Sequence, residues 1–269
     1  MAHSNILLHG KLLIVFLLFP FMSNAGIVIL NGLTHQHDVA PGQTYRGEIE
    51  IQNTVDTEQA VRLYQRDYTF NYTGEAFYNE PGSLDRSNSD WIDLSPTYLI
   101  LKPKEKRLIS YEVKTPSDNS LVGTYWSVIM VEGEAPVDTS SLQNGLSIQT
   151  QLRYAIQMVT TFNAPGERNL TFFDVNMVNE EGERMLMIDI ENKGEFLFRP
   201  DVSVELFNEN GQSQGVFIAS QKRLYPDTSA RFFVNVDDIG TGNYQSLLLA
   251  DCGGEDIFGI NIDLEITDD

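Results

Sequence analysis

Apolar and polar residues alternate with a period of two along most of the chain. In residues 45–52, one set of alternate positions is apolar or small and the other set is charged or polar. Successive side chains of a β-strand point to opposite faces of its sheet, so this pattern predicts a strand with one buried face. No window of ten or more residues shows a convincing apolar stripe with a 3.6-residue period, and we therefore predict almost no helix.

Comparable alternation predicts further strands on both sides of the sequence Asn163-Ala164-Pro165-Gly166, whose Pro-Gly pair breaks regular pairing and indicates a linker. Seven or so short strands on each side, at this spacing, are typical of Greek-key sandwiches. The sequence thus predicts an all-β protein with two tandem immunoglobulin-like β-sandwich domains, at residues 26–162 and 163–269. The expected strands are residues 45–52, 60–70, 98–101, 107–113, 124–132 and 146–158, then 170–178, 184–190, 201–207, 215–220, 230–236, 244–249 and 257–266.

The first 25 residues have the pattern of a cleaved secretory signal peptide. Lys11 precedes an apolar run at residues 12–21, and the small-residue site Ser23-Asn24-Ala25 follows. The run is about half of the ~20 residues that span a bilayer, so we expect no stable membrane insertion. Cleavage after Ala25 leaves 244 of the 269 residues. We expect the mature protein in the periplasm, or at the cell surface.

Charge narrows the choice of partners. One of the 18 Lys and Arg residues lies in the signal segment, so the mature chain carries 17 of them against 38 Asp and Glu, a formal charge of −21. Such a surface repels phosphate backbones and anionic lipids, and we expect no nucleic-acid partner. The lone Cys252 cannot form an internal disulfide, so stability must come from core packing.

The sequence offers little for catalysis. His35 and His37 are the only histidines after the signal segment, and neither lies near a nucleophile motif. The chain contains no phosphate-binding Gly-Lys loop and no His-Glu-x-x-His. We therefore predict a binding protein without a cofactor rather than an enzyme.

Two groups of residues could hold a metal ion, but we favour a structural interpretation of both. His35 and His37, two apart on a possible strand, would share one face and could bind a metal with a third ligand. Asp251, Glu255 and Asp256 crowd one turn, but their spacing fits no EF-hand. Polar residues near a strand end and a solvated hairpin tip are the simpler alternatives, and we predict no metal site.

The long segment 71–90, rich in Gly, Asn, Ser and Pro, is either a functional loop or an insertion, and we favour the insertion.

The segment 146–158 is unusually long for a strand. Six bulky apolar residues share one parity there, interrupted only by Thr150, and they are Leu146, Ile148, Leu152, Tyr154, Ile156 and Met158. Thirteen residues in extended conformation span roughly 40 Å, against about 17–20 Å for a usual strand. The preceding segment 124–131 is apolar at both parities, which indicates that both of its faces are covered. An over-long edge strand can pair with an incoming polypeptide, the mode of recognition called β-augmentation. Alternatively, the extra length only packs against the second domain.

The first domain resembles the PapD-like periplasmic chaperones of pilus assembly. The similar segments are Trp91-Ile92-Asp93-Leu94-Ser95-Pro96 with Leu101-Lys102-Pro103, then residues 124–131, and then 146–158 in the place of that family's donor strand. The resemblance implies two immunoglobulin-like domains that hold a pilus subunit by donor-strand complementation. It also implies subunit-binding residues at Leu146, Ile148, Thr150, Leu152, Arg153 and Tyr154.

In that family two basic residues anchor the subunit's C-terminal carboxylate, one in the first strand and one in the donor strand. Arg153 stands where the second would fall, whereas residues 26–39 contain no Lys or Arg. Our leading interpretation is a periplasmic chaperone-like protein, monomeric when free, that captures pilus or surface-protein subunits by donor-strand β-augmentation. The alternative is a structural or adhesive immunoglobulin-like module of the bacterial cell surface, which a second resemblance, about as loose as the first, favours.

Overall fold

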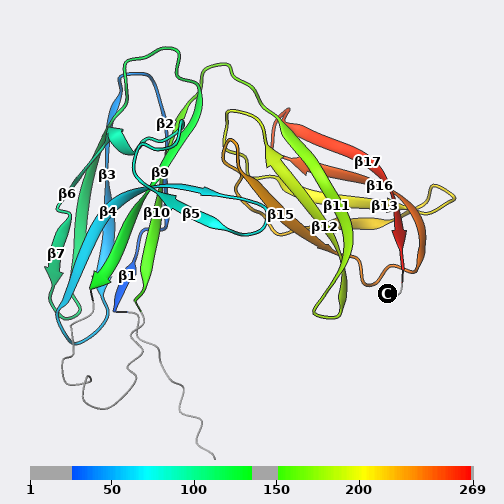
Figure 1. The fold of residues 1–269 in the computed structure, drawn as a ribbon, viewed down its shortest axis with the longest axis horizontal. Coiled ribbons are helices and arrows are strands. Elements are labelled where there is room, and N and C mark those ends of the chain that lie inside the picture. The colour runs from blue at the N-terminus through cyan, green and yellow to red at the C-terminus, as the bar shows by residue number, and fades with distance from the viewer. Residues whose placement is uncertain (1–25, 135–150, 268–269) are drawn as a thin grey trace, which may run out of the picture.

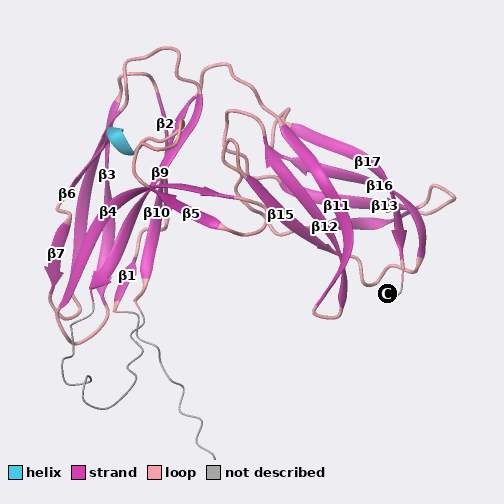
Figure 2. Ribbon diagram, in the orientation of Figure 1, coloured by secondary structure: helices cyan, strands magenta, loops and turns pink. Residues whose placement is uncertain are grey.

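The computed structural model describes residues 26–134 and 151–267, and the predicted signal peptide lies outside them. Within these ranges the chain is built from strands, with one short 3₁₀ turn, η1 (Ser89–Trp91), and no helix that is long and apolar enough to cross a membrane (Figure 2). Four sheets form two β-sandwiches, as Figure 1 shows. The prediction of an all-β protein with two immunoglobulin-like sandwiches is confirmed.

The first sandwich packs a four-stranded sheet against a six-stranded sheet. The four-stranded sheet has the order β1 (Ile27–Ile29), β3 (Thr44–Asn53), β8 (Lys106–Lys114), β6 (Ile92–Ser95). The six-stranded sheet has the order β2 (Thr34–Val39), β10 (Arg153–Phe162), β9 (Gly123–Glu134), β4 (Gln59–Phe70), β5 (Ala76–Asn79), with β7 (Tyr98–Leu101) also paired to β4. The first strand of the sequence is therefore split between the two sheets, as β1 in one and β2 in the other.

The second sandwich packs a three-stranded sheet against a four-stranded sheet. The first has the order β11 (Leu170–Glu180), β12 (Glu183–Asn192), β15 (Ser229–Asn235). The second has the order β14 (Ser213–Ile218), β13 (Asp201–Phe207), β16 (Gly242–Asp251), β17 (Ile257–Ile266). Every strand of these sheets follows residue 163, and every strand of the first two precedes it. We propose residues 26–162 and 163–269 as the two domains.

Alternation places the cores where the sequence predicts them. Ile49 and Ile51 of β3 are fully buried, whereas Glu48 and Glu50, at the alternate positions, lie on the outer face. From the facing sheet, Ile129 of β9 and Ile156 and Met158 of β10 join the same cluster. Each such side chain contributes about 1.5–3 kcal/mol when fully buried. The core of the second sandwich is separate and draws on alternate residues of β12, β13, β15 and β16.

The outer face of β9 and β10 packs against the second sandwich. Trp126 and Val159 are paired across these strands and form one buried cluster with Tyr225. The Trp126 and Tyr225 rings stack at 4.7 Å between centroids, and the Tyr225 hydroxyl donates to Gln157 Oε1 at 2.7 Å. The prediction that both faces of segment 124–131 are covered is thus confirmed: one face lies in the core and the other includes Trp126, which contacts the second domain.

Segment 71–90 belongs to this arrangement. Residues 76–79 form β5, which extends β4 into a hairpin that reaches toward β15 in Figure 1, and the Tyr72 N–H donates to Ser229 Oγ at 3.0 Å. Farther along, Asn88 is fully buried between the sheets. Its side-chain amide donates to Met158 O and accepts from the Ser127 hydroxyl. The segment closes the first sandwich and braces the second.

Candidate functional site

The two edges of β10 are paired to different extents. On one side β10 pairs antiparallel with β9 along its whole length, from Arg153↔Glu132 to Phe162↔Gly123. On the other side β2 runs parallel to it, but only from Gln157↔Thr34 to Phe162↔Val39. Within the described part of the chain, Arg153 to Ile156 therefore have a strand on one side only. The first four residues of β10 form an open edge.

Parity along β10 shows which main-chain groups face this opening. The Gln157 N–H donates to Leu33 O at 2.9 Å, so the main-chain groups of Gln157 point toward the β2 side. Main-chain groups of alternate residues point to the same side of a strand. The N–H and C=O of Arg153 and Ala155 therefore face the open side, whereas those of Tyr154 and Ile156 face β9.

The opening exists because the first strand leaves the six-stranded sheet at this level. Residues 30–33 cross from β1, which pairs with β3, to β2, which pairs with β10, and Gly32 takes φ of 91° in the crossing. The Tyr154 hydroxyl donates to Ile27 O at 2.9 Å and joins the two sheets at the corner. An added strand at this edge would lie beside β1.

Exposed leucines flank the open edge. Leu152 directly precedes β10 and is 49% exposed, and Leu33, whose carbonyl accepts from Gln157, is 47% exposed. Leu30, in the same crossing, is 40% exposed. Unpaired main-chain groups next to apolar side chains are what an incoming strand requires, because the backbone supplies hydrogen bonds and the side chains supply contact area.

The predicted site residues fall into two groups. Leu146, Ile148 and Thr150 lie outside the described residues. Leu152 is described but precedes the strand, Arg153 is its first residue, and Tyr154 turns its ring toward the core. The prediction of one continuous strand over residues 146–158 is wrong at residues 151 and 152, which pair with no strand of the described ranges. The observed strand begins at Arg153 and continues to Phe162.

Arg153 has a partner within the chain. Its Nε lies 3.2 Å from Glu132 Oε1, across the ladder on β9, and Glu132 also accepts from the Tyr64 hydroxyl. The Arg153 side chain is 56% exposed. Exposed ion pairs are weak, so this guanidinium can exchange Glu132 for another carboxylate. The role of Arg153 as a carboxylate anchor stays a prediction.

The two histidines are on β2, beside the same edge. His35 Nδ1 lies 2.9 Å from the Tyr111 hydroxyl, and the His37 ring packs on Tyr45 at 4.2 Å between centroids. Burial is the main cause that lowers the pKa of each imidazole. Burial also raises the pKa of Tyr111 to about 12. Over residues 26–134 and 151–267, no group of three His, Cys, Asp or Glu side chains gathers in a geometry suited to a metal ion.

The acidic residues of the turn near Cys252 form local hydrogen bonds and an ion pair. Asp256 Oδ2 accepts from Arg168 Nη1 at 2.7 Å, and Asp251 Oδ1 accepts from the Gly253 N–H. Burial, followed by the charges of Asp256 and Asp251, raises the pKa of the Cys252 thiol to about 12. At neutral pH the thiol is protonated and therefore a poor nucleophile.

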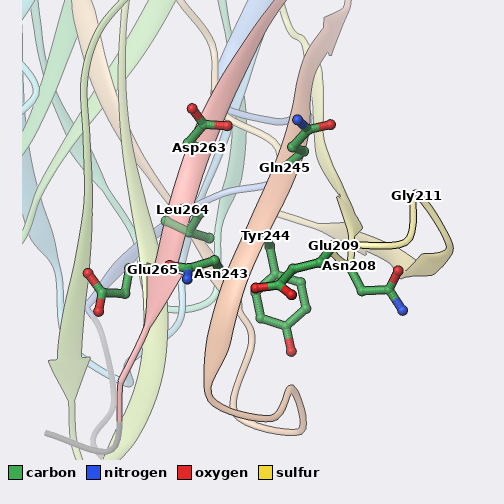
Figure 3. A pocket seen from close by; sticks show the side chains of 9 residues that line it. All are labelled: Asn208, Glu209, Gly211, Asn243, Tyr244, Gln245, Asp263, Leu264 and Glu265. Atoms are coloured by element: carbon green, nitrogen blue, oxygen red, sulfur yellow. The ribbon is translucent and has the colours of Figure 1, made fainter.

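The second sandwich has a groove at the end where β16 begins and β17 ends. It is an open groove of about 650 Å³ between the start of β16, the end of β17 and the turn after β13, and Figure 3 shows the side chains that line it, Tyr244 and Glu209 among them. Amides and carboxylates supply most of its polar groups. Its lining residues are Asn208, Glu209, Gly211, Asn243, Tyr244, Gln245, Asp263, Leu264 and Glu265.

Sequence reasoning did not find Ala155, Leu30 or Leu33. Ala155 has an unremarkable side chain, and its importance lies in main-chain groups that only the pairing of β2 and β10 leaves open. The one signal in the sequence was Gly32, which permits the crossing but does not say where it ends. This open edge is a tertiary feature.

Comparisons with known proteins complete the description. No protein-family model matches the chain, and no curated protein sequence matches it. Among solved structures, the chaperone–tip adhesin complex of CFA/I fimbriae biogenesis is 13% identical with a TM-score of 0.48, and the match covers 88% of this chain and 98% of that chain. The class 5 fimbriae chaperone CfaA is 15% identical with a TM-score of 0.45, and the match covers 87% of this chain and 98% of that chain.

The CsuC–CsuE chaperone–tip adhesion subunit complex of Acinetobacter baumannii is 15% identical with a TM-score of 0.45, and the match covers 89% of this chain and 98% of that chain. Fimbrial chaperones, the class that the sequence resemblance named, are therefore among the structural neighbours. With identities of 13–15% and TM-scores below 0.5, the function of this chain has to be inferred from its own geometry.

Proposed function

We propose that this chain is a periplasmic chaperone-like protein that binds an extended segment of a pilus or surface-protein subunit by adding it as a strand to the open edge of β10. The observation that carries the proposal is that Arg153 and Ala155 present main-chain groups to a side where the described chain places no strand. The exposed leucines beside this edge supply the apolar contacts that such a strand needs.

The most direct test removes one outward-facing main-chain N–H donor of β10 and keeps the hydrogen bonds between β9 and β10. The Ala155 N–H points away from β9, so Ala155→Pro takes away an outward donor and leaves the β9–β10 bonds in place. Ala155→Val is the matched control because it keeps the N–H and suits a strand. Co-expression with a candidate subunit encoded nearby, followed by size-exclusion chromatography, should give a 1:1 complex with the wild type and the Val variant but not with the Pro variant.

A second pair of variants tests the apolar contacts. Leu152→Asp places a charge beside the open edge, whereas Leu108→Asp makes the same change at an equally exposed leucine on β8, in the other sheet. Only the first should weaken capture of the subunit, and both should unfold at nearly the wild-type temperature. If Ala155→Pro and Leu152→Asp bind the subunit as well as their controls do, strand addition at β10 is ruled out.

The groove in Figure 3 favours one other candidate function, an adhesive module of the cell surface. Planar amides, carboxylates and a tyrosine are groups that hydrogen-bond sugar hydroxyls. Binding to peptidoglycan fragments that Tyr244→Ala abolishes and Ala155→Pro leaves intact would support this function. Absence of any such binding by the wild type would remove it.

A further inference from the structure

A small cavity lies between the β4–β5 hairpin of the first sandwich and the second sandwich. Tyr68, Phe70 and Tyr72 form its wall on the first sandwich, and Lys222, Arg223 and Arg231 line it from the second. The cavity has a volume of about 190 Å³. The hydrogen bond from the Tyr72 N–H to Ser229 Oγ and the Arg231 guanidinium over the Tyr72 ring, at 5.2 Å, hold the two walls together.

The three cations of this cavity are unequally neutralised. Arg231 makes a bidentate pair with the fully buried Asp189, through contacts of 2.8 and 2.7 Å, so its charge is balanced. Lys222 donates to the main-chain carbonyl of Arg231 and has no carboxylate partner among the described residues. Burial, and then the nearby Arg231, lower the pKa of the Lys222 ammonium, and the charge of Asp189 offsets them only in part.

Arg223 is the exceptional residue. Of the lysines and arginines in residues 26–134 and 151–267, it is the one that is partly buried and yet forms no ion pair or hydrogen bond. This is unexpected in a chain with a formal charge of −20, where carboxylates outnumber cations about twofold. A partly buried guanidinium without a partner loses hydration, and no ion pair or hydrogen bond compensates for that loss.

We propose that this cavity binds an oxyanion, a carboxylate or a phosphate group, held by Arg223 and Lys222 against the wall of Tyr68, Phe70 and Tyr72. Arginine recognises planar or tetrahedral oxyanions through two parallel N–H donors, and a lysine beside it adds a point charge. The volume is below the ~300 Å³ of sites for drug-sized ligands, so the cavity takes the charged group and little more. This inference does not depend on strand addition at β10, which lies on a different surface of the first sandwich.

Calorimetric titrations of the full chain at constant ionic strength test the proposal, with sodium acetate in one arm and inorganic phosphate in the other. We expect saturable binding of at least one of them and a loss of about tenfold or more in affinity for Arg223→Gln. Arg199→Gln is the matched control, because Arg199 is an exposed arginine of the same domain and also forms no ion pair. The arm that saturates identifies the oxyanion.

The control variant and a stability measurement keep a structural role apart from a binding role. Arg223→Gln should unfold at the same urea concentration as the wild type in the absence of the anion, and bound anion should stabilise the wild type and the Arg199→Gln variant only. Equal affinity of Arg223→Gln and wild type, or no saturable binding of either anion, would overturn the proposal. Ala155→Pro should bind the anion normally, so failure at one site is distinguishable from failure at the other.

Discussion

Gly123 lies where the backbones of the two sandwiches meet. It begins β9 with φ of 77°, and a Cβ there would lie only 2.0 Å from the main-chain oxygen of Glu195. The same oxygen accepts from the Thr124 N–H at 2.7 Å, and the Thr124 hydroxyl accepts from the Leu197 N–H at 2.9 Å. A side chain at position 123 would force these bonds apart, because the obstacle is backbone and cannot rotate away.

Gly123→Ala should therefore cost several kcal/mol of the free energy of unfolding, beyond the ~1–2 kcal/mol of a left-handed alanine. Gly253→Ala separates the two causes, since Gly253 has φ of 88° with no atom within 4 Å of its ideal Cβ. Urea denaturation of both variants measures the difference. Equal losses would mean that contact with Glu195 does not limit the structure.

At the scale of the element, alternation predicts most strands and misses those whose pairing depends on the rest of the fold. Residues 98–101, 201–207 and 257–266 form strands with the bounds that the pattern predicts. β1, β5 and β6 were not predicted, because three or four residues are too few to show a period. The predicted start of β10 was too early, because the apolar alternation continues N-terminal to Arg153, the first residue that pairs with β9.

The open edge predicts a contrast between two amides of β10. The Ala155 N–H faces the open side, whereas the Gln157 N–H donates to Leu33 O, so hydrogen exchange should be fast at Ala155 and slow at Gln157 in the free protein. Addition of a bound strand should slow exchange at Ala155 and leave Gln157 unchanged. Amide exchange followed by NMR resolves the two positions. Slow exchange at Ala155 in the free protein would show that another segment already covers the edge.

The histidines of β2 predict a loss of stability in mild acid. Burial, and then the charge of His37, lower the pKa of His35 below its ordinary 6.5, and its buried Nε2 has no hydrogen-bond partner among the described residues. The folded state therefore resists protonation, whereas the unfolded chain takes up a proton near pH 6.5. The contribution of His35 to stability is complete above pH 6.5 and is lost as the pH falls through the lower folded-state pKa.

The free energy of unfolding should accordingly decrease from pH 7.5 to about pH 5, before most carboxylates titrate. The double variant His35→Gln, His37→Gln should decrease less over the same interval, since glutamine does not titrate. Urea denaturation at several pH values measures both curves. Parallel curves would assign the acid sensitivity to other groups.

For the whole molecule, the sequence predicts two sandwiches but not how they are joined. In the sequence, the linker Asn163-Ala164-Pro165-Gly166 indicates only a break between the domains. In the structure, Glu167, which follows the linker, and Gly123, which begins β9, both contact Glu195. The aromatic contact is equally hidden, because Trp126 and Tyr225 are ninety-nine residues apart and either could belong to the core of its own domain. Only the sequence of β9, which is apolar on both faces, indicated that other residues cover the outer face of the sheet.

Tyr225 links the two sandwiches, and its replacement should separate their unfolding. Its ring is fully buried against Trp126 and Val159, and its hydroxyl donates to Gln157 Oε1. Tyr225→Phe loses that hydrogen bond and should cost about 1 kcal/mol, whereas Tyr225→Ala leaves a cavity and should cost about 3–5 kcal/mol.

Differential scanning calorimetry should show one transition for the wild type and the Phe variant, but two for Tyr225→Ala, because the remaining polar contacts between the sandwiches exchange readily with water. Tyr98→Ala removes an exposed ring of β7 from the first sandwich and should leave the single transition unchanged. A single transition in Tyr225→Ala would mean that the remaining contacts, among them the backbone contacts at Glu195, couple the domains. In that case Gly123→Ala, and not Tyr225→Ala, should be the variant that separates them.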